Sequence, residues 1–138
     1  MTEVIHAILG TKPAVATVAV SNIERARQFY QDVLGLAPVS AKESGVLSLA
    51  SADTTLLVYE SQFAGSNQAT AVTWILDGRG EERIEDVVHA LRDKGVHFEH
   101  YDFPGGTREG DVHIFGKIRN AWFKDPDGNI LSIVCETQ

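Results

Sequence analysis

The chain has 138 residues, a formal net charge of −7 at pH 7 and a pI of about 5.1. This length suits one domain, and a hydrophobic content of 43% is sufficient for a core. The acidic charge opposes binding to a phosphate backbone, so nucleic acid is not an expected partner. The single cysteine, Cys135, cannot form an internal disulfide, and no apolar stretch is long enough to span a bilayer. We therefore expect a cytoplasmic protein without a membrane partner.

The first half of the chain predicts a strand, a helix and two or three more strands. Residues 15–20 have strand composition, and Ser21 and Glu24 behind them have the spacing of a capping box. Apolar residues then recur at spacings of three and four, and the helix is expected to end at Gly35, which suits a left-handed cap. The strand-like runs that follow are 45–50 and 54–60.

The second half repeats this order of elements. After a polar loop, a strand leads into an amphipathic helix whose acidic residues lie early and whose basic residues lie late, as the helix dipole favours. A short strand and a long glycine-rich loop follow, and loops of this kind are more often functional than accidental. The predicted segments are the loop 61–70, the strand 71–76, the helix 82–94, the strand 96–100 and the loop 102–119.

A turn at residues 125–129 closes the second half. Pro126 fixes φ at the first corner of the turn, and Gly128 suits the left-handed position. The flanking residues 121–123 and 130–134 are rich in aromatic and β-branched side chains, which predicts two antiparallel strands. Two copies of one βαβββ unit thus account for nearly the whole chain.

With these motifs the chain resembles the vicinal oxygen chelate superfamily, which includes glyoxalases, bleomycin-resistance proteins and extradiol dioxygenases. The resemblance rests on residues 18–36, with their Phe29-Tyr30 and Leu34-Gly35 pairs, and on residues 123–129. It covers residues 14–136. The two motifs in this order are typical of the fold and say much less about the reaction.

The resemblance implies an α+β fold in which two tandem βαβββ modules form a cup-shaped, partly closed mixed sheet with helices packed outside. Module one would span about residues 14–61 and module two about residues 70–136 of a single domain, 1–138, with residues 1–13 as an N-terminal arm. Cups of this family hold an organic ligand or a metal. Related folds commonly pair, so a homodimer is expected.

The metalloenzymes of this superfamily take their metal ligands from four strand positions, two in each module. Spacing from the motifs places these positions at Val15, Leu56, Ala71 and Ser132, and none of them is a histidine or a carboxylate. Among their neighbours on the same face, only Glu60 could bind a metal. We therefore expect no metal and no other cofactor, so the metal-dependent chemistry of the family does not transfer directly.

The alternation of side chains along strands predicts a mainly apolar cup with a few hydroxyl groups. Such a lining suits a small, partly apolar or aromatic organic molecule, although the same side chains could fill the cup as core. Trp74 should point toward the helices, whereas Trp122 could line the cup or pack beneath a helix. The predicted ligand-binding residues are Val15, Thr17, Leu56, Val58, Ala71, Thr73, Arg108, Trp122 and Ser132.

Two polar residues are candidates for catalysis. His113 lies in the long loop, which could fold over the cup and place the imidazole where it can transfer a proton or orient a carbonyl. Glu60 ends a predicted strand and would serve as a base if it were buried. The bland alternatives are an exposed loop histidine and a solvated glutamate.

Three functions remain open at this stage. The first is a metal-independent protein that binds a small organic molecule in the cup. The second is a lyase, isomerase or dioxygenase of the same superfamily, which works either by metal-free acid/base chemistry with His113 or Glu60 or through metal ligands not recognised in the sequence. The third is an adaptor subunit with a filled cup.

Overall fold

The structure is a computed structural model that describes residues 8–40, 45–76 and 83–137. It contains two mixed sheets, neither of which closes into a barrel, so the predicted α+β class is confirmed. The first half comprises β1 (Ala16–Val20), α1 (Ile23–Arg27), the π-helical segment η2 (Gln28–Val33), β2 (Ala37–Ser40), β3 (Val46–Ser51) and β4 (Thr54–Glu60). The second half comprises β5 (Thr70–Ile75), α2 (Ile84–Asp93), β6 (Phe98–Glu99), β7 (Thr107–Glu109), β8 (Val112–Phe115), β9 (Ile118–Lys124) and β10 (Ile130–Glu136).

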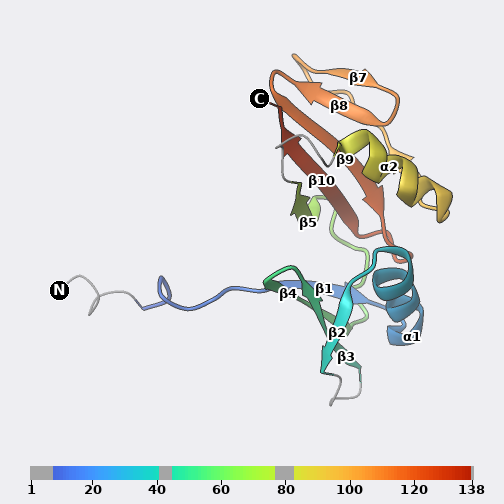
Figure 1. Cartoon of the computed structure of the whole chain (residues 1–138). Coiled ribbons are helices and arrows are strands. Elements are labelled where there is room, and N and C mark those ends of the chain that lie inside the picture. Colours follow the sequence, from blue (N-terminus) through green and yellow to red (C-terminus); the bar gives the residue numbers. More distant parts are fainter. Residues whose placement is uncertain (1–7, 41–44, 77–82, 138) are drawn as a thin grey trace.

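The two sheets have the same plan. The first sheet has the strand order β1-β4-β3-β2, and the second has the order β5-β10-β9-β8-β7, with β6 also paired to β9. In each sheet the first strand of the module pairs in parallel with the last one, and the remaining neighbours are antiparallel. Both helices lie on the same side of the molecule (Figure 1). The other face of each sheet is therefore turned away from the helices.

A single hydrophobic core joins the two modules on the helical side. In β1 and β4 every second side chain is buried there, as alternation along a strand requires. Trp74 on β5 points to this side and stacks on Phe123 with 6.4 Å between ring centroids, which confirms its predicted direction. The fully buried members of this core include Val18, Val20, Tyr30, Leu47, Leu49, Val58, Ile84, Phe123 and Leu131.

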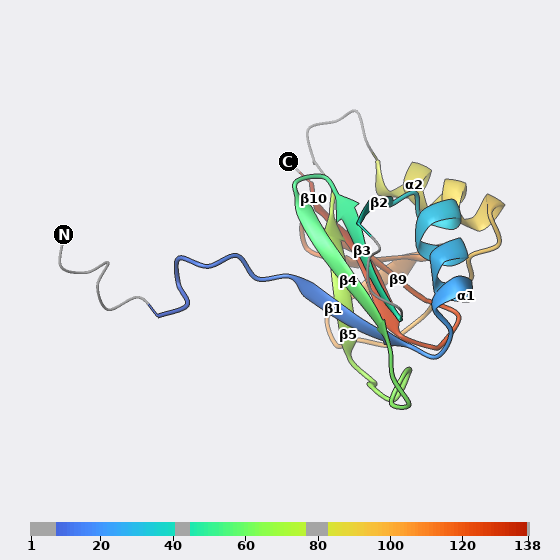
Figure 2. The ribbon, with the colours of Figure 1, turned by 90° about the horizontal axis from the view of Figure 1, so that it is seen from below.

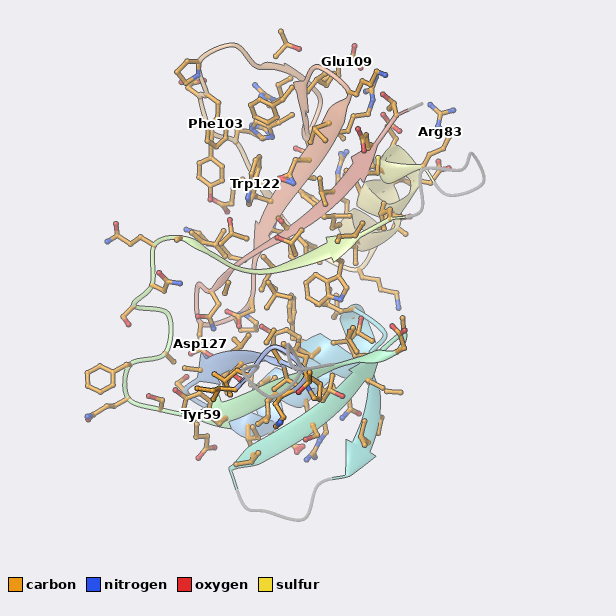
Figure 3. The ribbon with its side chains drawn as sticks, turned by 90° about the vertical axis from the view of Figure 1, so that its left-hand side faces the viewer. Tyr59, Arg83, Phe103, Glu109, Trp122 and Asp127 are labelled. Carbon is orange, nitrogen blue, oxygen red and sulfur yellow. The ribbon has the colours of Figure 1, made fainter. Side chains whose placement is uncertain are left out.

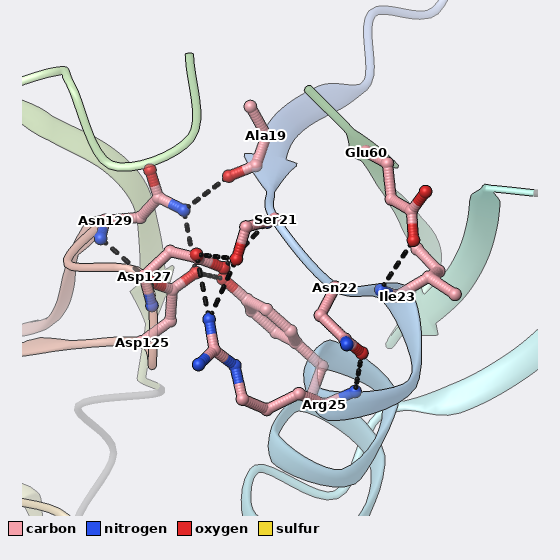
Figure 4. Close-up of polar contacts among 10 residues, drawn as sticks. Ala19, Ser21, Asn22, Ile23, Arg25, Glu60, Asp125, Asp127 and Asn129 are labelled. Atoms are coloured by element: carbon pink, nitrogen blue, oxygen red, sulfur yellow. Dashed lines mark hydrogen bonds and ion pairs between the residues drawn. The ribbon is translucent and has the colours of Figure 1, made fainter. Parts of the chain in front are cut away.

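The turn at residues 125–129 fastens the second module to the first (Figure 4). The buried Asp125 accepts a hydrogen bond of 2.7 Å from the Tyr30 hydroxyl, and Asn129 Nδ2 donates one of 2.7 Å to the Ala19 carbonyl. Asp127 accepts hydrogen bonds from the Ser21 amide at 3.1 Å and from the Ser21 hydroxyl. The predicted hairpin is thus present, and its polar turn is a latch between the modules.

Helix α1 is capped differently from the sequence prediction. The N-cap residue is Asn22, whose side chain accepts a hydrogen bond of 2.9 Å from the Arg25 amide. Ser21 does not cap the helix because Asp127 holds its hydroxyl. The predicted end at Gly35 is confirmed by a φ of 85° at that residue.

The segment 102–119 is not the long loop that the sequence suggested. It contains the hairpin of β7 and β8, which extends the second sheet beyond β9. Short strands with four glycines nearby lack the apolar alternation that marks a strand in sequence. This correction places His113 on a strand of the sheet.

The described part of the N-terminal arm extends away from both sheets (Figure 2). Ile8 and Leu9 are 82% and 75% exposed, while residues 1–7 of the predicted arm lie outside the described residues. Across the described ranges, no helix has both the length and the apolar character needed to cross a membrane.

Candidate functional site

The register of β1 and β4 decides which predicted residues face away from the helices. Thr17 pairs with Leu57, whereas Val58 pairs with the buried Val18. Because paired residues point to the same side of a sheet, Thr17 and Val58 lie on opposite faces. Leu56 and Val58 are 3% and 0% exposed and belong to the core, so the expected grouping of both with Val15 and Thr17 was wrong.

On the second sheet, three predicted residues do come together on the face turned away from the helices. Ser132 pairs with Thr73 on one side and with Trp122 on the other. The hydroxyl groups of Thr73 and Ser132 are 2.8 Å apart and share a hydrogen bond. Ala71 is exposed at the register shift where β5 meets β10, next to Thr70, whose hydroxyl accepts a hydrogen bond of 3.1 Å from the Trp122 indole.

Trp122 belongs to an aromatic cluster on this face (Figure 3). The cluster comprises Tyr101, Phe103, His113, Phe115 and Trp122. The Trp122 ring centroid lies 4.9 Å from that of His113, 5.5 Å from that of Tyr101 and 5.3 Å from that of Phe103. Phe103 and Phe115 are also in edge contact, with centroids 5.3 Å apart. Rings in such edge and tilted arrangements present both faces and edges to a neighbour.

A pocket of about 250 Å³ opens against this cluster. Its walls come from the segment after β6 and from the β7–β8 hairpin, and the rings supply its apolar surface. Arg108 at its rim donates a hydrogen bond of 2.6 Å to the Gly110 carbonyl, which holds the guanidinium in the hairpin. The lining residues are Tyr101, Asp102, Phe103, Gly106, Thr107, Arg108, His113 and Phe115.

His113 is the most constrained polar group of the pocket. The side chain is 2% exposed, and its Nε2 accepts a hydrogen bond of 3.0 Å from the Tyr101 amide. Among the described residues, His113 Nδ1 has no hydrogen-bond partner, and neither has the buried Tyr101 hydroxyl. Buried polar atoms without a partner are rare in folded proteins, and each needs an explanation.

The surroundings keep both groups uncharged. Burial lowers the pKa of His113, and electrostatic interaction with the nearby His100 and Arg108 acts in the same direction. Burial, together with the negative charge of Glu99, raises the pKa of the Tyr101 phenol. Near neutral pH the pocket therefore presents a neutral imidazole and a neutral phenol.

Glu60 lies elsewhere and has a structural contact. It ends β4 in the first sheet, and its carboxylate accepts a hydrogen bond of 3.0 Å from the Ile23 amide at the start of α1. A negative charge at this position suits the positive end of a helix. The structure thus does not bring the two predicted catalytic residues, Glu60 and His113, together.

The metal that the fold family implies does not fit these residues. The expected ligand positions, Val15, Leu56, Ala71 and Ser132, carry hydroxyl or apolar side chains, and so do Thr17, Leu57 and Thr73 on the outer face of the strands. Neutral hydroxyls are weak ligands for the divalent ions of this family, which favour imidazole and carboxylate. In residues 8–40, 45–76 and 83–137, no three or more His, Cys, Asp or Glu residues are grouped as a metal site.

The comparison with known families decides the relationship of this chain. The sequence profile of the Glyoxalase/Bleomycin resistance protein/Dioxygenase superfamily matches residues 12–133. The chain belongs to this superfamily. A comparison with curated protein sequences found no significant match.

Solved structures of the superfamily share the fold at low sequence identity. TnmS3, an antibiotic binding protein from Streptomyces sp. CB03234, is 19% identical over 94% of this chain and 99% of its own, with a TM-score of 0.66. The fosfomycin resistance protein FosX from Listeria monocytogenes is 12% identical over 92% of this chain and 94% of its own (TM-score 0.68). Lactoylglutathione lyase from Agrobacterium tumefaciens is 16% identical over 91% and 93% (TM-score 0.65).

The sequence prediction missed three rings of the aromatic cluster. Tyr101 and Phe103 are two residues apart, as are His113 and Phe115, so each pair can point to one side of an extended chain. That alternation was a usable signal. The pairing of His113 with Asn120 on β9, which sets the ring beside Trp122, could not be read from a segment interpreted as a loop.

Proposed function

We propose that this protein binds a small aromatic organic molecule in the pocket against the aromatic cluster. The observation that carries the proposal is the aromatic pocket itself, whose lining includes His113, a residue with a buried Nδ1 that lacks a partner among the described residues. A ligand that bonds to this atom would remove the cost of an unpaired buried polar group, about 1–3 kcal/mol.

The size and lining of the pocket favour a compact ligand. Its volume of about 250 Å³ is below the usual range for drug-sized ligands, roughly 300–1,000 Å³, so a molecule of one or two fused rings would fill it. Each favourable contact between rings adds about 0.5–1.5 kcal/mol. TnmS3, an antibiotic binding protein with the same fold, is consistent with a binding role for this chain.

The proposed binding does not require a metal, because side chains and rings supply every contact invoked. An acid/base lyase or isomerase is less well supported. Such an enzyme needs a second proton-transfer group near the first, and Glu60, the other candidate, lies on the first sheet and contacts the start of α1.

The two tryptophans give a direct test. Trp122 belongs to the cluster and Trp74 lies on the helical side, so their indole N–H signals in a ¹H–¹⁵N spectrum report the two faces separately. We expect naphthalene, added in the presence of EDTA, to shift the Trp122 signal and leave that of Trp74 in place. The variant Trp74→Phe assigns the two signals.

Phe103→Ala removes one wall of the pocket and should weaken binding by roughly tenfold, since a favourable contact between rings contributes about 0.5–1.5 kcal/mol and about 1.4 kcal/mol is tenfold in affinity. The matched control is Phe63→Ala, which removes a ring that is 67% exposed and does not line the pocket. The proposal fails if the Trp122 signal does not respond to naphthalene, or if both variants affect binding equally.

We also propose that the protein is a homodimer. Apolar side chains are exposed on and beside the face turned away from the helices: Val15 is 45% exposed, Tyr59 is 38% exposed and Ile75 is 82% exposed. A second copy would cover them, and burial of apolar surface contributes about 25 cal/mol per Å². Native mass spectrometry should show a dimer at micromolar concentration, and a monomer under these conditions would contradict the proposal.

A further inference from the structure

We infer that His113 is a fixed hydrogen-bond donor, and that the pocket therefore selects uncharged ring compounds that carry a carbonyl-type oxygen. The inference deepens the proposed function and rests on it. It assigns to His113 the recognition of an acceptor atom and not the removal of a proton.

The tautomer of His113 follows from its contact with Tyr101. A backbone amide can only donate, so the hydrogen bond of 3.0 Å from the Tyr101 N–H to His113 Nε2 requires a lone pair on Nε2. In a neutral imidazole the proton must then lie on Nδ1. Nδ1 is the atom that has no partner among the described residues, so its N–H group is an unpaired donor on a residue that lines the pocket.

A charged imidazolium is disfavoured by the same contacts. A proton on Nε2 would point at the Tyr101 N–H and replace a hydrogen bond of 3.0 Å with a repulsion between two donors. The side chain is also 2% exposed, and burial penalises the charged form. With Nε2 occupied by an amide and Nδ1 already protonated, neither nitrogen is free to accept a proton from a substrate.

The complement of a buried neutral donor is an uncharged acceptor. A ketone or quinone oxygen at the edge of a planar ring can meet Nδ1–H while the ring contacts the aromatic cluster. The Tyr101 hydroxyl, also without a partner among the described residues, lies in the same pocket wall and can donate as well. An aromatic cation offers only donors and would leave both groups unpaired.

The first measurement is the tautomer itself. In protein labelled with ¹⁵N-histidine, two-bond ¹H–¹⁵N correlations distinguish a protonated Nδ1 from a protonated Nε2. We expect His113 to show a protonated Nδ1 in a neutral ring at pH 7. A protonated Nε2 in the neutral ring, or an imidazolium at pH 7, would overturn the inference.

The second measurement uses two probes of the same shape, 1-indanone and indane, which differ by a carbonyl oxygen in place of two hydrogens. The preference for 1-indanone is the dissociation constant of indane divided by that of 1-indanone. This ratio is compared between the unaltered protein and His113→Phe, so that the difference in hydrophobicity between the probes cancels. We expect the ratio of the two dissociation constants to fall by roughly five- to twentyfold in His113→Phe. His113→Asn, whose amide can place an N–H near Nδ1, should keep part of the preference.

The outcomes separate this inference from the proposed function. If both probes bind and the ratio is the same in the protein and in His113→Phe, the pocket is a ring-binding site and the inference is wrong. If neither probe shifts the Trp122 signal of the unaltered protein, the proposed function fails and the inference with it. Binding of indane to His113→Phe shows that the variant has kept its pocket.

Discussion

The latch between the modules allows a stability prediction from individual contacts. Tyr30 is fully buried, and its hydroxyl donates to Asp125 at 2.7 Å. Asp125 also accepts from the Asp127 amide at 3.0 Å and from the Asn129 amide and side chain at 2.8 Å each. Tyr30→Phe deletes one donor and leaves the carboxylate with its other three. Because a hydrogen bond to a charged acceptor contributes about 1.5–3 kcal/mol, we expect Tyr30→Phe to lower the free energy of unfolding by about 2 kcal/mol.

Asp125→Ala should cost more, because it removes the acceptor and leaves several buried donors without a partner. With about 1–3 kcal/mol for each of the donors on Tyr30 and Asn129, the expected loss is about 4 kcal/mol. In the double variant the Tyr30 donor is absent as well, so the two losses should not add. The double variant should be no less stable than Asp125→Ala alone.

Urea denaturation followed by tryptophan fluorescence measures these losses, since Trp74 stacks on Phe123 and its indole N–H donates a hydrogen bond to Ser51 of the first module. Tyr59→Phe is the matched control because Tyr59 is 38% exposed, and it should change stability by less than about 0.5 kcal/mol. If Tyr30→Phe is as neutral as the control, or if the losses of Tyr30→Phe and Asp125→Ala simply add, the reasoning about the latch is refuted.

Gly65 has a φ of 73°, and an added Cβ would collide with the Asp127 carbonyl, so Gly65→Ala should lower the free energy of unfolding in urea by at least about 2 kcal/mol. The control is Gly35→Ala, which has a φ of 85° but open space around the site and should lower it by about half as much. Equal losses in the two variants would exclude the collision. Burial and Asp125 raise the pKa of Tyr30, so the contribution of this shift to the free energy of unfolding is fully present below the unfolded pKa of about 10. The free energy of unfolding should therefore fall as the pH rises above about 10, and it should fall less steeply in Tyr30→Phe. Burial lowers the pKa of His113, so the contribution of this shift to the free energy of unfolding is fully present above about pH 6.5. It should fall at lower pH, where His113 in the unfolded chain binds a proton. His113→Asn should make this fall less steep, and an unchanged pH profile would contradict the prediction.

The features that were predictable from sequence are those set by local chemistry. The turn with Pro126 and Gly128 appears where its residue types require it, and Gly35 ends the first helical segment with a positive φ. The prediction of Ser21 as the N-cap residue was wrong because of a long-range contact. Ser21 is bound by Asp127, which lies 106 residues further along the chain. Contacts between the modules decide such positions, and they have no local signature.

The second feature that the sequence did not reveal is which face of a strand each side chain occupies. A shift of one residue exchanges the two faces of a strand, and both faces of β4 carry apolar side chains, so its sequence does not reveal the parity. Leu56 and Val58 were assigned to the wrong face for this reason, whereas the hydroxyls of Thr73 and Ser132 mark their shared face clearly. His113 was identified as a candidate, but its burial depends on a hairpin that the sequence did not indicate.

The β7–β8 hairpin lies at one edge of the second sheet, whereas the latch at residues 125–129 contacts the first module. Under the proposed binding function, recognition and folding therefore depend on separate segments. Changes in the length or composition of residues 107–115 can alter what the pocket accepts without touching the contacts that keep the two halves together. For protein engineers, this hairpin is the segment to diversify when new ring compounds are to be captured, with the turn at 125–129 kept constant.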